Sequence, residues 1–187
     1  YEGKVFVVDN RRISVTQYQS VKDAQMLAAM GMDGTQIKKR LEETAADSVI
    51  FITVDTLKYL KKGGRITPAA AALGTLLRLK PVLTIQGEKL DAFAKARTMK
   101  QARSMMITAI TRDLENRFDD MTGEKTYIDV AHTDNDEMAQ ELAAELRELF
   151  PETEVRVEPL SLSVACHIGP GALAIAATKK LEIGSLL

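Results

Sequence analysis

Residues 55–68 read DTLKYLKKGGRITP, and this stretch sets the order of the elements around it. Leu57 and Leu60 have the spacing of one helical face, so they predict a short helix. Asp55 or Thr56 can cap the first N–H groups of that helix. The glycine pair that follows predicts its end, because glycine adopts the positive φ that a C-terminal cap needs.

A second helix is predicted to begin at Thr67 and Pro68, which suit the N-cap and the first helical position. Arg65 is therefore expected between two helix ends. The local sequence alone favours a helix connection with a solvated arginine there. The alanine-rich run at 69–77 predicts a helix whose small side chains either allow close packing or line a tube, and composition does not choose between these.

Alternating and apolar segments outward from this stretch predict strands at 4–9, 49–54, 81–85, 89–97, 126–131, 154–157 and 172–177. Helical periodicity and caps predict helices at 16–30, 33–41, 98–118 and 138–150. The interleaved order predicts an α/β fold with a mixed sheet, flanking helices and one hairpin. We place a domain boundary near residue 46, which divides the chain into 1–46 and 47–187.

Composition excludes several classes of function. The 187 residues can build a real core, and the net charge of −1, with lysine and glutamate intermixed, argues against a nucleic-acid surface. The apolar runs at 68–77 and 161–178 are too interrupted to span a bilayer, so no integral membrane segment is expected. Cys166 is the single cysteine; we expect it to be a small buried residue in a cytoplasmic protein. Tyr1 as first residue suggests that the natural beginning is missing.

His167 is the main candidate for chemistry. It stands two residues before the turn Gly169-Pro170-Gly171, where free backbone N–H groups could hold an imidazole and an anion together. A structural histidine is equally compatible with this position. In an extended segment Cys166 and His167 would point to opposite faces, which disfavours a catalytic pair.

Other motifs are weaker. His132 is expected to be a loop or cap residue, and the two histidines lack the spacing of a zinc site, so no metal is predicted. The sequence GEKT at 123–126 lacks the context of a phosphate loop and is predicted to be a turn. No dinucleotide fingerprint occurs. Arg65 and Arg97 are candidates to meet an anion or an acidic partner.

Four motifs in order carry a family resemblance over nearly the whole chain: TLKYLKKGGRI at 56–66, LKPVL at 79–83, KAR at 95–97 and HIGPG at 167–171. Together they resemble the DegV family, bacterial fatty-acid-binding proteins that serve as the lipid-carrying subunit of fatty acid kinase. The resemblance implies a two-domain α/β protein that encloses one long-chain fatty acid. It further implies that a separate ATP-dependent kinase converts the presented carboxylate to an acyl phosphate.

The carrier is then not itself an enzyme and needs no cofactor. The resemblance places His167, with Gly169 and Gly171, beside the lipid carboxylate. It gives Arg65 and Arg97 a part in kinase docking or phosphate handling. Residues 4–46 resemble the tail of the family's first domain, and the family's hydroxyl cluster that grips the carboxylate lies outside the sequence.

Two other classes of function stay open. One is a stand-alone enzyme that acts on a small anionic metabolite with His167 as acid or base. The other is an interaction or scaffold domain, which would show neither ligand nor turnover.

Overall fold

The computed structural model describes residues 1–73, 79–86 and 89–182. Its centre is a six-stranded mixed sheet in the order β3-β2-β1-β6-β4-β5. The strands are β1 (Ser48–Thr53), β2 (Lys80–Gln86), β3 (Lys89–Ala96), β4 (Thr126–Thr133), β5 (Val155–Pro159) and β6 (Ala172–Lys179). The β4 and β5 strands pair in parallel, and every other pair is antiparallel. The predicted mixed α/β fold is confirmed.

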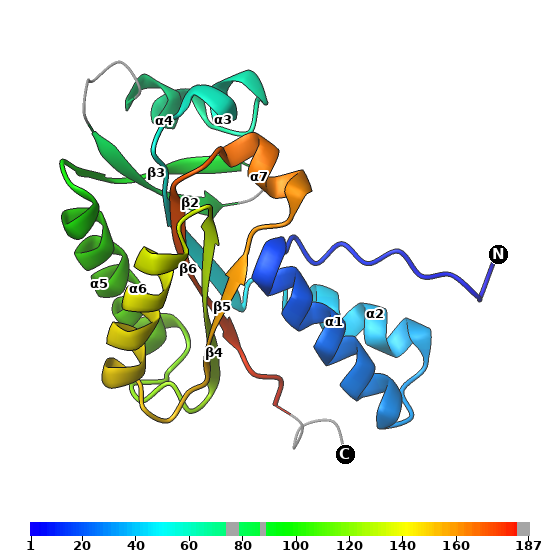
Figure 1. Cartoon of the computed structure of the whole chain (residues 1–187). Helices are drawn as coiled ribbons and strands as arrows, with labels where there is room; N and C mark the ends of the chain where they lie inside the picture. The colour runs from blue at the N-terminus through cyan, green and yellow to red at the C-terminus, as the bar shows by residue number, and fades with distance from the viewer. Residues whose placement is uncertain (74–78, 87–88, 183–187) are drawn as a thin grey trace.

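The helices are α1 (Ser14–Ala29), α2 (Gly34–Glu43), α3 (Lys58–Lys62), α4 (Pro68–Leu73), α5 (Met99–Arg117), α6 (Asp136–Leu149) and α7 (Leu162–Ile168). Figure 1 shows α5 and α6 together on one face of the sheet, with α1 and α2 on the other side. Predicted caps are confirmed at α2, where the Gln36 N–H donates to Asp33, and at α5, where the Gln101 N–H donates to Thr98. Leu76 and Leu77, expected in the alanine-rich helix, lie outside the described residues.

The predicted hairpin is confirmed, because β2 and β3 pair antiparallel from Lys80 with Ala96 to Gln86 with Lys89. The turn expected at Gln86 and Gly87 lies partly outside the described residues. Thr67 caps α4, as predicted, because its hydroxyl oxygen accepts a hydrogen bond from the Ala70 N–H.

Successive residues of β6 point to opposite faces of the sheet, and the side chains on the two faces differ in size. Leu173, Ile175 and Ala177 belong to the core beneath α5 and α6. The residues between them belong to the opposite core, and all of them are alanines: Ala172, Ala174 and Ala176. Small side chains fill little volume, so these alanines leave space over the centre of this second face.

The strand predicted at 4–9 is wrong. This segment is irregular, and Val5 and Val7 are 62% and 80% exposed. It is attached instead to α2, where the Asp9 N–H donates to Glu42 and Lys38 donates to the Val7 carbonyl. An apolar run becomes a strand only where a neighbouring strand pairs with it, and none of the six described strands does so.

The segment before the Gly-Pro-Gly turn is helical, not extended. His167 lies in the last turn of α7, and Gly169 forms the C-terminal cap with φ of 85°. Cys166 is exposed, so its predicted burial is wrong; its thiol donates to the Ser163 carbonyl one turn earlier. The domain boundary near residue 46 stays a prediction. In the described ranges, no helix is long and apolar enough to cross a bilayer.

Candidate functional site

A cavity of about 640 Å³ lies on the alanine face of the sheet. Its walls are mostly apolar side chains from β1, β2 and β6: Ile50, Ile52, Ile85, Ala174 and Ala176. The other apolar lining residues are Ile13, Val15, Leu60, Leu90, Ala131, Leu160, Val164 and Ile168. This volume is typical of a site for a small organic ligand. The lining favours a ligand with an apolar body.

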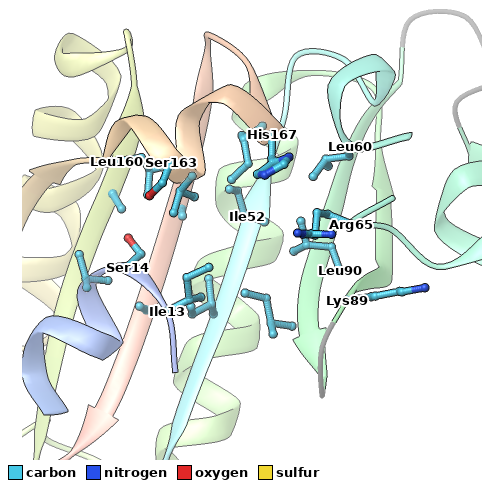
Figure 2. A pocket seen from close by; sticks show the side chains of 18 of the residues that line it. Ile13, Ser14, Ile52, Leu60, Arg65, Lys89, Leu90, Leu160, Ser163 and His167 are labelled. Atoms are coloured by element: carbon cyan, nitrogen blue, oxygen red, sulfur yellow. The ribbon is translucent and has the colours of Figure 1, made fainter. Parts of the chain in front are cut away.

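The polar groups of the cavity are unevenly placed. Figure 2 shows Arg65, Lys89 and His167 on one side, while Ile13 and Ser14 approach from α1 on the other. Arg65 is fixed beside Lys89 because the Leu90 N–H donates to the Arg65 carbonyl at 3.1 Å. Asp9, Arg11 and Ser163 also line the cavity, which therefore combines an apolar sheet wall with polar groups in which the three cations Arg11, Arg65 and Lys89 outnumber one carboxylate.

The glycine pair in the opening stretch shapes this side. Gly64 has φ of 64°, and its N–H donates to the Lys61 carbonyl while the Arg65 N–H donates to the Leu60 carbonyl. These two bonds are the Schellman ending of a helix, which turns the chain so that Arg65 leaves α3 toward β3. The prediction that glycine ends this helix is confirmed. The positive φ belongs to Gly64 alone, because Gly63 has φ of −80°.

Gly63 instead lets α3 and α7 pack closely against each other. A Cβ at this position would lie 2.6 Å from Nδ1 of His167. At the next contact between α3 and α7, a Cβ on Gly169 would lie 2.4 Å from the ring of Tyr59. The GGR motif and the HIGPG motif are therefore packed into each other, and the fit holds the His167 ring at the cavity.

The expected free N–H groups of the Gly-Pro-Gly turn are not found. The Gly169 N–H donates to the Ala165 carbonyl, and the Gly171 N–H donates to the Thr133 carbonyl, both at 2.7 Å. Neither glycine lines the cavity. Both have positive φ, at 85° and 80°, so they set the path of the chain between α7 and β6.

Arg97 lies apart from the other predicted residues. It follows β3 at the end opposite Leu90, to which Arg65 is bonded. Six residues of β3 lie between Leu90 and Arg97, which places the two roughly 20 Å apart. Arg97 is exposed and does not line the cavity, so the structure brings Arg65 and His167 together but leaves Arg97 away from them.

His132 has a structural position, as expected. It is buried at the end of β4, and its Nδ1 accepts the Asn135 N–H at 3.3 Å where α6 begins. Asn135 in turn donates from its side chain to the Gly171 carbonyl. Among the described residues, no group of three or more His, Cys, Asp or Glu side chains is placed to hold a metal ion.

Sequence reasoning missed the part of α1 in the cavity wall. Ile13, Ser14 and Val15 line it, as do Asp9 and Arg11 just before them, although the rest of the lining begins only at Ile50 in the sequence. Ser14 has φ of 57°, so the chain bends sharply just where α1 starts. A serine carries no signal for this conformation, and only the packing of α1 on the sheet reveals it.

Comparison with known proteins identifies this architecture. A family model described as an uncharacterised protein of the DegV family matches residues 1–180. The chain belongs to the DegV family. A DegV domain-containing protein of Clostridium perfringens is 31% identical over 175 residues, which cover 93% of this chain and 58% of that relative. Protein YqaC of Lactococcus lactis, also DegV domain-containing, is 36% identical over 157 residues, covering 82% of this chain and 53% of the relative.

Solved DegV structures have the same fold. A DegV family protein from Thermus thermophilus, described by its fatty acid binding, superposes with a TM-score of 0.82 at 32% identity and covers 95% of this chain and 61% of its own. DegV of Bacillus subtilis, described as a fatty acid binding protein, gives a TM-score of 0.80 at 28% identity, with 94% and 61% covered. The chain thus spans about three fifths of the length of the DegV relatives it matches.

Proposed function

We propose that this DegV chain binds one long-chain fatty acid, with the acyl tail on the isoleucine and alanine wall and the carboxylate on the side of Arg65 and His167. The observation that supports this most directly is the cavity itself, because its sheet wall is apolar and Arg65, Lys89 and His167 lie together on one side; Asp9, Arg11, Ser14 and Ser163 also line it. An anionic amphiphile has the same two-part chemistry. The fatty acid binding described for the Thermus and Bacillus relatives supports the same choice.

The tail supplies most of the binding energy in this account. About a dozen buried methylenes, at about 0.8 kcal/mol each, amount to on the order of 10 kcal/mol before the costs of association. A hydrogen bond to the charged carboxylate adds about 1.5–3 kcal/mol. His167 is the proposed donor of that bond, and Gly169 and Gly171 act by setting the chain that carries it.

The carrier role extends the proposal to a partner. We infer that a separate ATP-dependent kinase phosphorylates the presented carboxylate, with Arg65 offsetting negative charge near the head group and Arg97 contacting the kinase. Arg65 is exposed at the cavity, and Arg97 is exposed at the far end of β3, so one partner surface would have to cover both. This chain supplies binding and orientation, and ATP chemistry belongs to the partner.

Native mass spectrometry of the purified chain tests lipid binding. One fatty acid should be bound in the native spectrum and absent after denaturation. A native mass equal to the denatured mass, even after incubation with stearic acid, would refute the proposal.

The kinase role is tested separately with Arg65→Ala and Arg97→Ala. Both variants should retain the lipid but lose turnover when the kinase and ATP are added. Lys22→Ala, which removes an exposed cation from α1, is the control and should keep turnover. Loss of lipid from both arginine variants would contradict the docking role.

A further inference from the structure

The buried face of α1 is largely polar. Its buried positions include Thr16, Gln19, Ser20 and Asp23, which follow one helical face, while Val15 and Leu27 are the buried apolar residues at its ends. Two large apolar side chains of this segment point outward instead: Val21 and Met30 are 49% and 39% exposed. Thr16, Ser20 and Asp23 bond to partners within residues 12–23. Among the described hydrogen bonds of this face, the one between Gln19 and Arg156 reaches the sheet.

One side chain outside α1 connects this polar face to the sheet. Arg156 of β5 donates from Nε to Asp129 of β4 at 2.7 Å and from Nη2 to Oε1 of Gln19 at 3.3 Å. Gln19 also donates a hydrogen bond from its Nε2 to Asp23 at 2.8 Å. The amide orientation is fixed by these partners, since arginine can only donate and the aspartate oxygen accepts.

The arginine also lies over two aromatic rings. Its guanidinium carbon lies 5.0 Å from the ring centre of Tyr18 on α1 and 5.8 Å from that of Tyr127 on β4. Arg156 thus contacts α1 through a hydrogen bond and a cation–π contact, about one helical turn from the residues that line the cavity.

The cost of leaving these groups unpaired is high. Asp129 is fully buried, and burial raises the pKa of its carboxyl, which the hydrogen bond from Arg156 opposes. The charges of Glu158 and Glu154 raise it further. Burial likewise raises the pKa of Asp23, whose opposing partners are Gln19 and Arg12. The network stays in place only while each carboxylate keeps its donor.

Arg156 does not itself line the cavity on the alanine face, whereas Ile13, Ser14 and Val15 at the start of α1 do. We propose that Arg156 is a positioning residue: it holds the first turns of α1 against the sheet and thereby keeps the cavity closed on that side. The predicted consequence, slow release of bound fatty acid, rests on the proposed function. The proposal that Arg156 holds α1 in place does not rest on that function.

Arg156→Lys is the variant of choice, because lysine keeps the charge but cannot donate to Asp129 and Gln19 at once with a fixed fork. Arg103→Lys is the matched control. Arg103 is similarly buried, with a side chain 17% exposed against 20% for Arg156, and it bridges α5 to Glu141 and Glu145 of α6 on the other face of the sheet. Gln19→Met is a second variant, which removes the bond from Arg156 together with the bond to Asp23 and leaves Arg156 and Asp129 paired.

Two measurements are made on the whole chain. Hydrogen exchange without lipid should speed up in the amides of residues 15–23 for Arg156→Lys and Gln19→Met, and stay unchanged for Arg103→Lys. Dissociation of a fluorescent fatty acid should be about ten-fold faster for the first two variants, the equivalent of one hydrogen bond to a charged group. The control should release it at the wild-type rate.

Unchanged exchange in α1 for both variants would overturn the positioning role. Faster exchange with an unchanged dissociation rate would also overturn it, because α1 would then not close the cavity. If Arg156→Lys does not fold, Gln19→Met decides. If the wild-type chain binds no fatty acid at all, the proposed function fails, and the exchange result still decides whether Arg156 holds α1.

Discussion

Replacing Gly63 by alanine would move His167 without touching the chemistry of the histidine. Gly63 has φ of −80°, which any residue adopts, so the backbone accepts alanine. The new Cβ would lie 2.6 Å from Nδ1 of His167, and ordinary contacts begin near 3.4 Å, so the ring must retreat by about 0.8 Å (3.4 − 2.6). A shift of this size stretches a hydrogen bond beyond its working range.

The expected effect falls on binding rather than folding. Loss of conformational freedom in the unfolded chain makes Gly→Ala favourable by about 0.4–1 kcal/mol, which offsets part of the clash, so stability should change by less than about 1 kcal/mol. Losing the carboxylate bond of His167 costs about 1.5–3 kcal/mol, which weakens stearic acid binding roughly 10-fold to 100-fold. Displacement of a fluorescent fatty acid measures the affinity, and urea unfolding measures the stability.

Gly64→Ala is the matched control, one residue along. Its φ is 64° and a Cβ there meets nothing within 4 Å. Alanine should cost about 1–2 kcal/mol of stability through backbone strain and leave lipid affinity unchanged. Wild-type affinity in Gly63→Ala would refute the placement of the carboxylate at His167. Equal loss of affinity in both variants would show that binding follows stability instead.

Three further predictions concern the cavity, a cap and a buried charge. Ala176→Leu should fill part of the cavity and displace about two methylenes, weakening stearic acid about ten-fold but decanoic acid less in the same displacement assay; an equal loss for both acids would contradict a tail on β6. Thr67→Val removes the cap of α4 and its bond to Asp91 and should cost about 1–2 kcal/mol in urea unfolding, so an unchanged midpoint would count against the cap. Because burial raises the pKa of Asp129 above its usual 3.8, the folded chain keeps this proton where the unfolded chain has lost it, and the contribution of this carboxyl to stability falls as pH rises. The Asp129→Asn variant lacks that loss, so its unfolding free energy relative to wild type should rise as the pH increases above about 4, and parallel pH curves would contradict it.

Local signals predicted the elements that depend on neighbouring residues. The caps at Asp33, Thr67 and Thr98 are where the sequence places them, since a cap needs only a side-chain oxygen and N–H groups two or three residues away. The hairpin follows from two apolar segments at short separation. These features are encoded within a few residues and can be inferred one at a time.

Other features depend on packing between residues that are far apart in the sequence, and local signals did not predict them. Residues 4–9 have the composition of a buried strand, yet they have no strand partner and attach to α2. The turn after His167 suggested free N–H groups, yet Thr133, from a distant strand, takes the one at Gly171. Gly63 looked like part of a helix stop, and its contact with His167 is visible only once α3 and α7 are packed.

The site was predicted in part for the same reason. Four ordered motifs pointed to Arg65 and His167, and both line the cavity. The role of α1 carried no local signal, because its buried face is polar and its link to the sheet joins Gln19 to Arg156, 137 residues apart. A helix with a polar buried face resembles a solvated helix until its partner is known.

A crystal structure of the chain with stearic acid tests the central claim most directly. The account predicts one acyl chain along Ile50, Ile52 and Ala176, with a carboxylate oxygen within hydrogen-bond distance of His167. A lipid bound elsewhere, or one in the cavity with its carboxylate at the end away from Arg65 and His167, would contradict it.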